Sequence, residues 1–242
     1  MKSLVDTSSC CRRVAEDSRP SPSPGADVPT SVASAPGDVP QRVIDEVFSS
    51  ASGSESICRY KDLLINQGIE WGLLGPREVD RIWGRHILNS AAVVELIPRG
   101  ASVADVGSGA GLPGIPVAIL RPDLTVDLIE PLLRRSTFLT HSVDDLGITG
   151  RVSVRRERAE QVGRTYDVVL SRALAPLDRL IRWCLPLMKP SGQILAIKGA
   201  SAWQELIDHD RLIAASGLTA DVVTPRLVDE LDATTVVRLR LA

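Results

Sequence analysis

An acid followed by closely spaced glycines is the feature of this chain that most clearly points to chemistry. Asp105 is followed by Gly107, Gly109, Gly111 and Gly114. Glycine suits a turn that takes positive φ angles and brings the backbone against a ligand, because no Cβ stands in the way. Apolar residues before and after the run favour a strand and then a helix. Such a strand–turn–helix unit opens doubly wound α/β domains, which bind nucleotide-like ligands at the carboxyl ends of their strands.

Two ligands compete for this turn. Gly109, Gly111 and Gly114 match the spacing of the dinucleotide fingerprint, which predicts a nicotinamide-dependent dehydrogenase. The frame that begins at Asp105 is instead typical of S-adenosylmethionine enzymes. A carboxylate at the strand end attracts the cationic amine and sulfonium of that ligand, whereas it would repel a pyrophosphate. A glycine turn without any ligand is the third alternative.

Further polar residues follow the next strands. Glu130 lies 19 residues after Gly111, where an acid accepts hydrogen bonds from ribose hydroxyls. Arg172 follows the fourth expected strand, beside the position of a reactive methyl group in a methyltransferase. It offers a cation and hydrogen-bond donors but neither a base nor a nucleophile. The motifs of adenine-N6 and cytosine-C5 methyltransferases are missing at this point. We therefore expect Arg172 to position the reactants, with no general base.

These residues need a repeated strand–helix framework to bring them together. After the glycine turn, apolar runs predict strands at 125–130, 152–155, 166–170 and 193–197, and helices at 132–146, 176–188 and 202–216. The alternation predicts a mostly parallel sheet with right-handed crossovers. The last two strands, 220–224 and 234–241, have no long helix between them and are expected to form an antiparallel hairpin. That ending is common in class I methyltransferases and unusual in dehydrogenases.

The first hundred residues divide into two parts. Residues 1–40 are rich in Ser and Pro, which predicts a disordered extension that is dispensable for folding. Apolar residues at helical spacing then predict an N-terminal helical cap over 41–100, with helices from Gln41, over 55–66 and over 77–97. Gly68 is the expected end of the second of these helices. The methyltransferase domain would follow over 101–242.

Composition limits the remaining possibilities. The formal net charge is −2, yet residues 131–198 hold 12 Lys/Arg against 6 Asp/Glu, which favours a polyanionic partner beside the ligand site. Arg134 and Arg135 are the expected phosphate contacts there. The four cysteines show no metal-ligand spacing, no run of 18 apolar residues occurs, and no apolar signal core begins the chain. We expect a cytoplasmic monomer without a metal.

Taken together, the motifs resemble those of the RsmG/GidB family, the methyltransferases of guanine N7 in small-subunit (16S) ribosomal RNA. The resemblance covers about residues 41–242 in order. It rests on Arg85 to Ser90, Asp105 to Pro116, Glu130 with Arg134 and Arg135, Arg158 to Glu160, Ser171 to Ala173, and Lys198-Gly199. It implies a class I fold with seven strands, and S-adenosylmethionine as cofactor.

The motifs and the resemblance together predict roles for single residues, and Gly107, Leu112, Ala159, Glu160 and Arg172 are the cofactor contacts that the resemblance implies. S-adenosylmethionine contacts are expected from Asp105, Gly107, Gly109, Gly111, Leu112, Glu130, Ala159, Glu160 and Arg172, and RNA contacts from Arg85, His86, Arg134, Arg135 and Lys198. His86 has a structural role as its alternative. The segment 69–74 and Asn89 depart from the family pattern, which affects the details of RNA contact. A methyltransferase of another RNA, a protein or a small molecule remains the alternative function.

Overall fold

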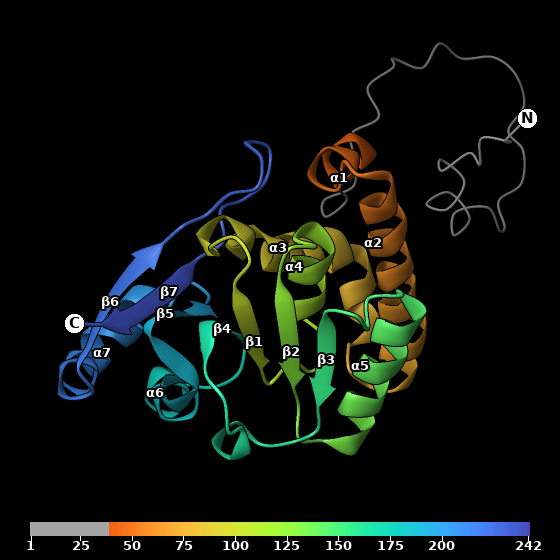
Figure 1. Ribbon diagram of the computed structural model, residues 1–242. Helices are drawn as coiled ribbons and strands as arrows, with labels where there is room; N and C mark the ends of the chain where they lie inside the picture. Colours follow the sequence, from red (N-terminus) through yellow and green to blue (C-terminus); the bar gives the residue numbers. More distant parts are fainter. Residues whose placement is uncertain (1–38) are drawn as a thin grey trace, which may run out of the picture.

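The computed structural model describes residues 39–242 (Figure 1). The expected disordered extension over 1–40 lies outside the described residues, apart from its last two positions. The order of elements then follows the predicted alternation of strands and helices.

A single seven-stranded sheet forms the centre of the fold. Its strands are β1 (Ser102–Val106), β2 (Thr125–Ile129), β3 (Val152–Arg155), β4 (Tyr166–Arg172), β5 (Met188–Ile197), β6 (Leu218–Val223) and β7 (Val236–Leu241). They lie in the order β3-β2-β1-β4-β5-β7-β6; β7 pairs antiparallel with β5 and β6, and every other pair is parallel. The expected terminal hairpin is therefore confirmed. The inserted antiparallel β7 distinguishes this sheet from the 3-2-1-4-5-6 order of dinucleotide-binding folds.

Helices cover both faces of the sheet, as the ribbon in Figure 1 shows. α4 (Gly114–Leu120) and α5 (Leu133–Asp145) cover one face, and α6 (Leu177–Cys184) and α7 (Ala202–Ala215) cover the other. Short 3-10 turns occupy Ala159–Gln161 and Leu185–Leu187. Within residues 39–242, the helices are too short or too polar for any of them to traverse a lipid bilayer.

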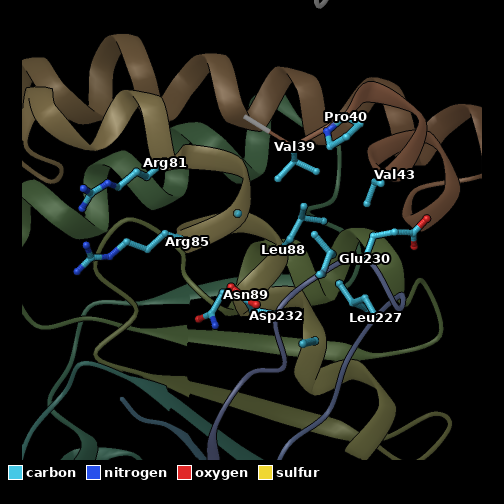
Figure 2. Close-up of a pocket in the computed structure, with 13 residues that line it drawn as sticks. Val39, Pro40, Val43, Arg81, Arg85, Leu88, Asn89, Leu227, Glu230 and Asp232 are labelled. Atoms are coloured by element: carbon cyan, nitrogen blue, oxygen red, sulfur yellow. The ribbon is translucent and has the colours of Figure 1, made fainter. Parts of the chain in front are cut away.

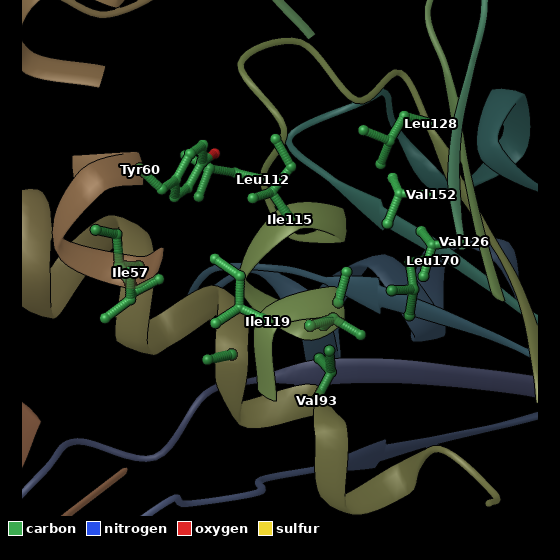
Figure 3. Close-up of a cluster of buried hydrophobic side chains, with 14 of the residues drawn as sticks. Ile57, Tyr60, Val93, Leu112, Ile115, Ile119, Val126, Leu128, Val152 and Leu170 are labelled. Carbon is green, nitrogen blue, oxygen red and sulfur yellow. The ribbon is translucent and has the colours of Figure 1, made fainter. Parts of the chain in front are cut away.

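The N-terminal helices share a hydrophobic cluster with the α4 face of the sheet. They begin with α1 (Gln41–Val47) and α2 (Ala51–Leu63), and Ile57 and Tyr60 of α2 are fully buried. Figure 3 shows Tyr60 beside Leu112 and Ile115, which follow the glycine turn. The cap is thus positioned to support the turn directly.

The expected helix over 77–97 is wrong as a single continuous helix. The segment is a succession of short pieces: a 3-10 helix Pro76–Arg81, a π-helix Ile82–Leu88, α3 (Asn89–Ala91) and a 3-10 helix Ala92–Leu96. Arg81 leaves the helical region with φ −123° and ψ 9°. Gly84 follows three residues later, and glycine weakens a helix interior. Irregular helical stretches of this kind are frequent at functional sites.

The second expected helix, 55–66, is longer at both ends. It begins at Ala51, because the Ser50 side chain accepts a hydrogen bond from the Gly53 amide at 3.0 Å. It continues as a π-helix over Leu64–Gly68, so Gly68 does not end it. Gly72, at φ 68°, makes the stop, and the Leu73 amide donates to the Gly68 carbonyl at 2.8 Å.

The helix expected over 176–188 ends early, while the following strand is longer than its apolar run indicates. α6 stops at Cys184 and a 3-10 turn containing Pro186 follows. Met188 already belongs to β5, where Tyr166 of β4 is its partner. Pairing with a neighbouring strand, which local hydropathy does not report, extends β5 across polar residues.

Candidate functional site

Asp105 supports the glycine turn from beneath. The side chain is fully buried, and its Oδ2 accepts hydrogen bonds from the Ser108 hydroxyl at 2.5 Å and the Gly114 amide at 3.0 Å. Its Oδ1 is buried without a hydrogen-bond partner among the described residues. Asp105 thus lies beneath the turn and not among the residues that line the two cavities described below. Burial raises the pKa of Asp105 to about 6.

The turn takes the positive φ angles that the glycines predict. Gly107, Gly109 and Gly111 have φ values of 71°, 58° and 95°. A Cβ at Gly107 would collide with Leu174, and one at Gly111 would collide with Ile115. At Gly109 the nearest atom to a Cβ would be the Gly107 carbonyl oxygen at 3.8 Å, so that position faces open space.

Glu130 lies at the end of β2 and is tied to the same turn. Its Oε2 accepts from the Gly109 amide at 3.1 Å, and its Oε1 accepts from the Leu132 amide at 3.0 Å. The carboxylate is buried, and Arg135 Nη1 lies 3.8 Å from Oε2. The adjacent strands β1 and β2 thus present a glycine turn and an acid at one edge of the sheet.

A cavity of about 360 Å³ opens at this edge. This volume falls within the range typical of small-molecule sites. Apolar walls from Ile129, Leu132, Leu174 and Trp183 face the polar groups of Glu130 and Glu160. Four of the expected cofactor residues line it, namely Gly107, Glu130, Ala159 and Glu160. Gly109 and Gly111 shape the turn, whereas the Leu112 side chain is buried in the hydrophobic cluster beneath it.

A second cavity, of about 750 Å³, adjoins the first through Ala173. Ala173 has a positive φ of 49°, which is uncommon for a residue with a Cβ. Arg85, Arg172 and Lys198 all line this cavity, so the structure brings together three residues that span more than a hundred positions of the sequence. The second cavity therefore gathers Arg85 and Lys198, which were predicted to contact RNA, around Arg172.

The basic side chains of the second cavity differ in their exposure and in the hydrogen bonds that they already make. Lys198 Nζ donates to the Ala175 carbonyl at 2.9 Å and to Glu205 Oε2 at 2.7 Å, and the side chain is only 11% exposed. Arg85 is exposed. Arg172 is held through one nitrogen only, since Nη2 donates to the Arg85 carbonyl at 2.9 Å and lies 3.2 Å from His86 Nδ1.

The structure separates Arg134 and Arg135, which the sequence pairs. Arg135 lines the first cavity beside Glu130. Arg134 lies with Trp71 in a shallow depression and donates to the Glu70 carbonyl at 3.3 Å. Their neighbouring positions on α5 therefore place them in different surroundings, and their role as phosphate contacts stays a prediction.

Arg85 and Asn89 also line a third cavity, of about 640 Å³, which Figure 2 shows. Its walls come from the start of α1, the irregular helical segment 76–96 and the loop before β7. Arg81 and Arg85 extend from the helical segment in the same direction (Figure 2). The second and third cavities therefore lie side by side along the cap, where Arg85 and Asn89 line both.

Two residues that the sequence analysis did not single out complete the site. The Tyr60 hydroxyl donates to the Ala110 carbonyl at 2.7 Å, which ties the cap to the glycine turn. Glu78 Oε2 lies 2.7 Å from His86 Nε2. The first contact joins residues 50 positions apart, which only the fold brings together, whereas an acid eight residues before a histidine was a usable signal for the second.

We expect Tyr60→Phe to weaken both folding and cofactor binding. The change leaves a buried carbonyl of the turn without its donor, which costs about 1–3 kcal/mol of unfolding free energy. Urea denaturation and calorimetric titration with S-adenosylmethionine measure the two effects. The chain's other tyrosine supplies the control, because the Tyr166 hydroxyl donates to Asp127 Oδ2 at 2.7 Å on the other sheet face. Tyr166→Phe should lose stability with unchanged affinity; equal affinity in both variants would contradict the role given to Tyr60.

Asp105→Asn should show a pH-dependent change in stability. The pKa of about 6 in the folded state lies above the ordinary value of 3.8, so ionisation of Asp105 favours the unfolded state. Wild-type stability from this group is greatest below pH 4 and is lost as pH rises through 6. The unfolding free energy of the Asn variant relative to wild type should therefore improve by on the order of 1 kcal/mol between pH 5 and pH 7.5.

Urea denaturation at the two pH values provides that comparison, and Asp123→Asn is its control. Hydrogen bonds from Arg121 and the Gly100 amide lower the pKa of Asp123, so this carboxylate stays ionised in both states over the same range. Its variant should show no pH-dependent difference between pH 5 and pH 7.5. A pH-dependent difference of the same size in both variants would show that the effect does not come from the Asp105 carboxyl.

Comparison with known proteins agrees with this geometry. Residues 54–230 match the family model GidB, rRNA small subunit methyltransferase G. A ribosomal RNA small subunit methyltransferase G of Mycolicibacterium gilvum is 56% identical over 180 residues, which cover 72% of this chain and 77% of the relative. One of Salinispora tropica is 52% identical over 166 residues, covering 65% and 69%.

Solved structures share the fold at low identity. The mitomycin 7-O-methyltransferase MmcR is 16% identical with a TM-score of 0.54, covering 84% of this chain and 67% of its own. The B. subtilis M1A22 tRNA methyltransferase TrmK is 17% identical with a TM-score of 0.50, covering 66% of each chain. The fold is that of class I S-adenosylmethionine-dependent methyltransferases. By the match over most of its length, the chain belongs to the GidB family, rRNA small subunit methyltransferase G.

Proposed function

We propose that this enzyme transfers the methyl group of S-adenosylmethionine to N7 of a guanine in small-subunit (16S) ribosomal RNA. The observation that carries the proposal is the junction of two cavities at Ala173. One is lined by the glycine turn and Glu130, and the other is lined by Arg85 and Arg172. A nucleoside-sized site thus lies beside a basic one, and Ala173 lines both. Family membership supports the rRNA substrate.

The residues of the first cavity fit S-adenosylmethionine. Glu130 would accept hydrogen bonds from ribose hydroxyls, and the apolar walls beside Ala159 would take the adenine. Asp105 lies buried beneath the turn, so its carboxylate would act on the cationic cofactor through its charge from behind the cavity wall. When bound, the cofactor supplies an electrophilic methyl group on a sulfonium. Its positive charge suits a site with two buried carboxylates at its edge.

Guanine N7 agrees with the groups that face the second cavity. N7 carries a lone pair and no proton, so its alkylation requires positioning and no proton abstraction. Among the described residues, the acid that lines this cavity, Glu205, is paired with Lys198. Arg172 keeps Nε and Nη1 without a partner within residues 39–242, and these can donate to the substrate or the cofactor.

The RNA would approach along the cap. Arg81 and Arg85 are exposed, and Arg85 borders both the second and the third cavity. Arginines in this position can contact phosphates, stack on unpaired bases and donate hydrogen bonds to base edges, and the last of these contacts distinguishes a guanine in an RNA loop. The proposal places the enzyme in the cytoplasm as a monomer that acts on rRNA, with a small-subunit particle as the assembled form of the substrate.

Mass spectrometry of rRNA tests the proposal. Small-subunit rRNA from cells that lack the gene should lose one 7-methylguanosine, and the wild-type gene should restore it. A Gly109→Val gene is the matched control and should not restore it. In vitro, the purified chain with labelled S-adenosylmethionine should modify subunits or rRNA from the deletion strain. Unchanged 7-methylguanosine in that strain, or label found only in protein or in another RNA, would overturn the proposal.

A further inference from the structure

His86 lies between an acid and the arginine at the centre of the site. The side chain is buried, with Nε2 2.7 Å from Glu78 Oε2 and Nδ1 3.2 Å from Arg172 Nη2. The three residues come from the 3-10 helix Pro76–Arg81, the π-helix Ile82–Leu88 and the end of β4. A chain of polar contacts therefore runs from the cap into the second cavity.

The chemistry of the partners assigns the histidine protons. A guanidinium has donors only, so His86 Nδ1 must present its lone pair to Arg172. In a neutral imidazole the other nitrogen then carries the proton, and Nε2–H donates to Glu78. Glu78 thus selects the tautomer that accepts from Arg172, which is the way outer partners set the orientation of a histidine.

The same contacts restrict Arg172. Its Nη2 donates both to His86 Nδ1 and to the Arg85 carbonyl at 2.9 Å, and both acceptors belong to the π-helix of the cap. The two bonds hold one nitrogen and leave Nε and Nη1 for the reactants. The irregular π-helix is what brings a backbone carbonyl and the adjacent side chain to one guanidinium.

We propose that Glu78 and His86 are positioning residues that hold the Arg172 guanidinium, so that methyl transfer slows when His86 takes up a proton. This inference rests on the proposed function. A protonated imidazole has donors at both nitrogens. Nδ1–H would then face the donors of Arg172, and two positive charges would lie side by side. The arginine would lose one of its two anchors and move out of place.

The charges around His86 set the pH at which this happens. Glu78 favours the imidazolium, while Arg172, Arg85 and burial oppose it, and burial is the largest effect. The pKa of His86 is lowered from its ordinary value of 6.5, so the residue is neutral at pH 7 and above. The rate should be constant above about pH 7 and fall at lower pH.

Variants of His86 separate positioning from packing. Single-turnover methylation of unmethylated small ribosomal subunits, with excess enzyme and saturating S-adenosylmethionine, reports the step. His86→Ala should lower the rate at pH 8 by about tenfold, because Arg172 is misplaced. His86→Asn offers an oxygen acceptor near the Nδ1 position and does not titrate. It should keep the rate within about threefold of wild type and lose the fall at low pH.

Two further variants identify the source of the low-pH fall. Glu78→Gln keeps an acceptor for Nε2–H but removes the charge that favours the imidazolium, so the fall should move to lower pH. His141→Ala, at an exposed position of α5, should leave the profile unchanged. A fall that persists in His86→Asn would belong to another group, such as Asp105, and would overturn the inference. Inactivity of the wild-type enzyme on both unmethylated small subunits and their rRNA would instead contradict the proposed function.

A spectroscopic measurement covers the case in which the variants fold poorly. Nitrogen-15 NMR of the wild-type chain with S-adenosylmethionine distinguishes the two neutral tautomers of histidine. The chain has three histidines, so His141→Ala and a matching His209 variant assign the remaining signal. We expect His86 to be the Nε2–H tautomer at pH 8. The Nδ1–H tautomer, or a protonated ring at that pH, would refute the contact with Arg172 on which the inference depends.

Discussion

Arg172→Ala should reduce the single-turnover rate of methyl transfer on the order of 10²-fold, because a reaction loses about this much rate when its reactants are no longer held in alignment. Arg172 is anchored through Nη2 by the Arg85 carbonyl and His86 Nδ1, and its side chain lines the second cavity. Rapid-quench assays with excess enzyme measure this rate, because product release does not contribute to a single turnover.

Arg172→Lys should recover little of that loss. An ammonium is a point charge without the planar fork, so it cannot hold both acceptors and still donate toward the reactants in a fixed plane. Arg179→Ala is the matched control, since Arg179 is an exposed arginine of α6, and its rate should equal that of wild type. Full activity of Arg172→Lys would show that only the positive charge matters.

The same assay tests whether a general base exists. A base-dependent enzyme loses rate with a slope of one below the pKa of its base. Here the rate should be flat from about pH 7 to 9, because neither guanine N7 nor an arginine titrates in that range. A rise with slope one between these limits would mean that a group in the site removes a proton.

Gly109→Val should abolish measurable binding of S-adenosylmethionine while leaving the fold intact. A β-branched residue at φ 58° is strongly disfavoured, so the peptide must rotate. The Gly109 amide then no longer meets Glu130 Oε2, and the acid of the first cavity loses one of its two anchors. Because a Cβ at this position faces open space, the protein itself does not clash and folding should survive.

Gly100→Val is the matched control for that prediction. Gly100 has φ 66°, also has open space around a Cβ, and precedes β1 at the end opposite the glycine turn. Both variants should lose a similar 1–3 kcal/mol of unfolding free energy from backbone strain. Only Gly109→Val should lose affinity in calorimetric titration. Wild-type affinity in Gly109→Val would show that the glycine turn does not take part in cofactor binding.

The class of fold followed from local signals. Gly107, Gly109 and Gly111 have the positive φ angles that glycine predicts. A residue without a Cβ adopts such angles without strain, so this feature does not depend on the rest of the fold. The strands around them are apolar runs of the right length, and their alternation with helices selects a parallel sheet. The antiparallel hairpin at the end followed from the missing crossover helix.

The irregular helical segment that replaces the expected helix over 77–97 could not be predicted from the spacing of its apolar residues. Apolar residues over 77–97 recur every three to four positions, and 3-10, π and α turns all satisfy that pattern approximately. Packing of the cap on the glycine turn and on β4 selects among them. The contact of Arg172 with the Arg85 carbonyl exists only because the π-helix places that carbonyl there.

The sequence by itself determined which residue types gather at the ends of the strands, but the tertiary structure decided what each of them contacts. Asp105 is turned beneath the glycine turn, and Arg134 and Arg135 diverge from one helix start. Tyr60 reaches Ala110 across 50 residues, and Arg172 reaches His86 across 86. Hydrogen bonds depend on positions within a few tenths of an ångström, and such positions are set by the packing of whole elements, which spacing along a chain does not encode.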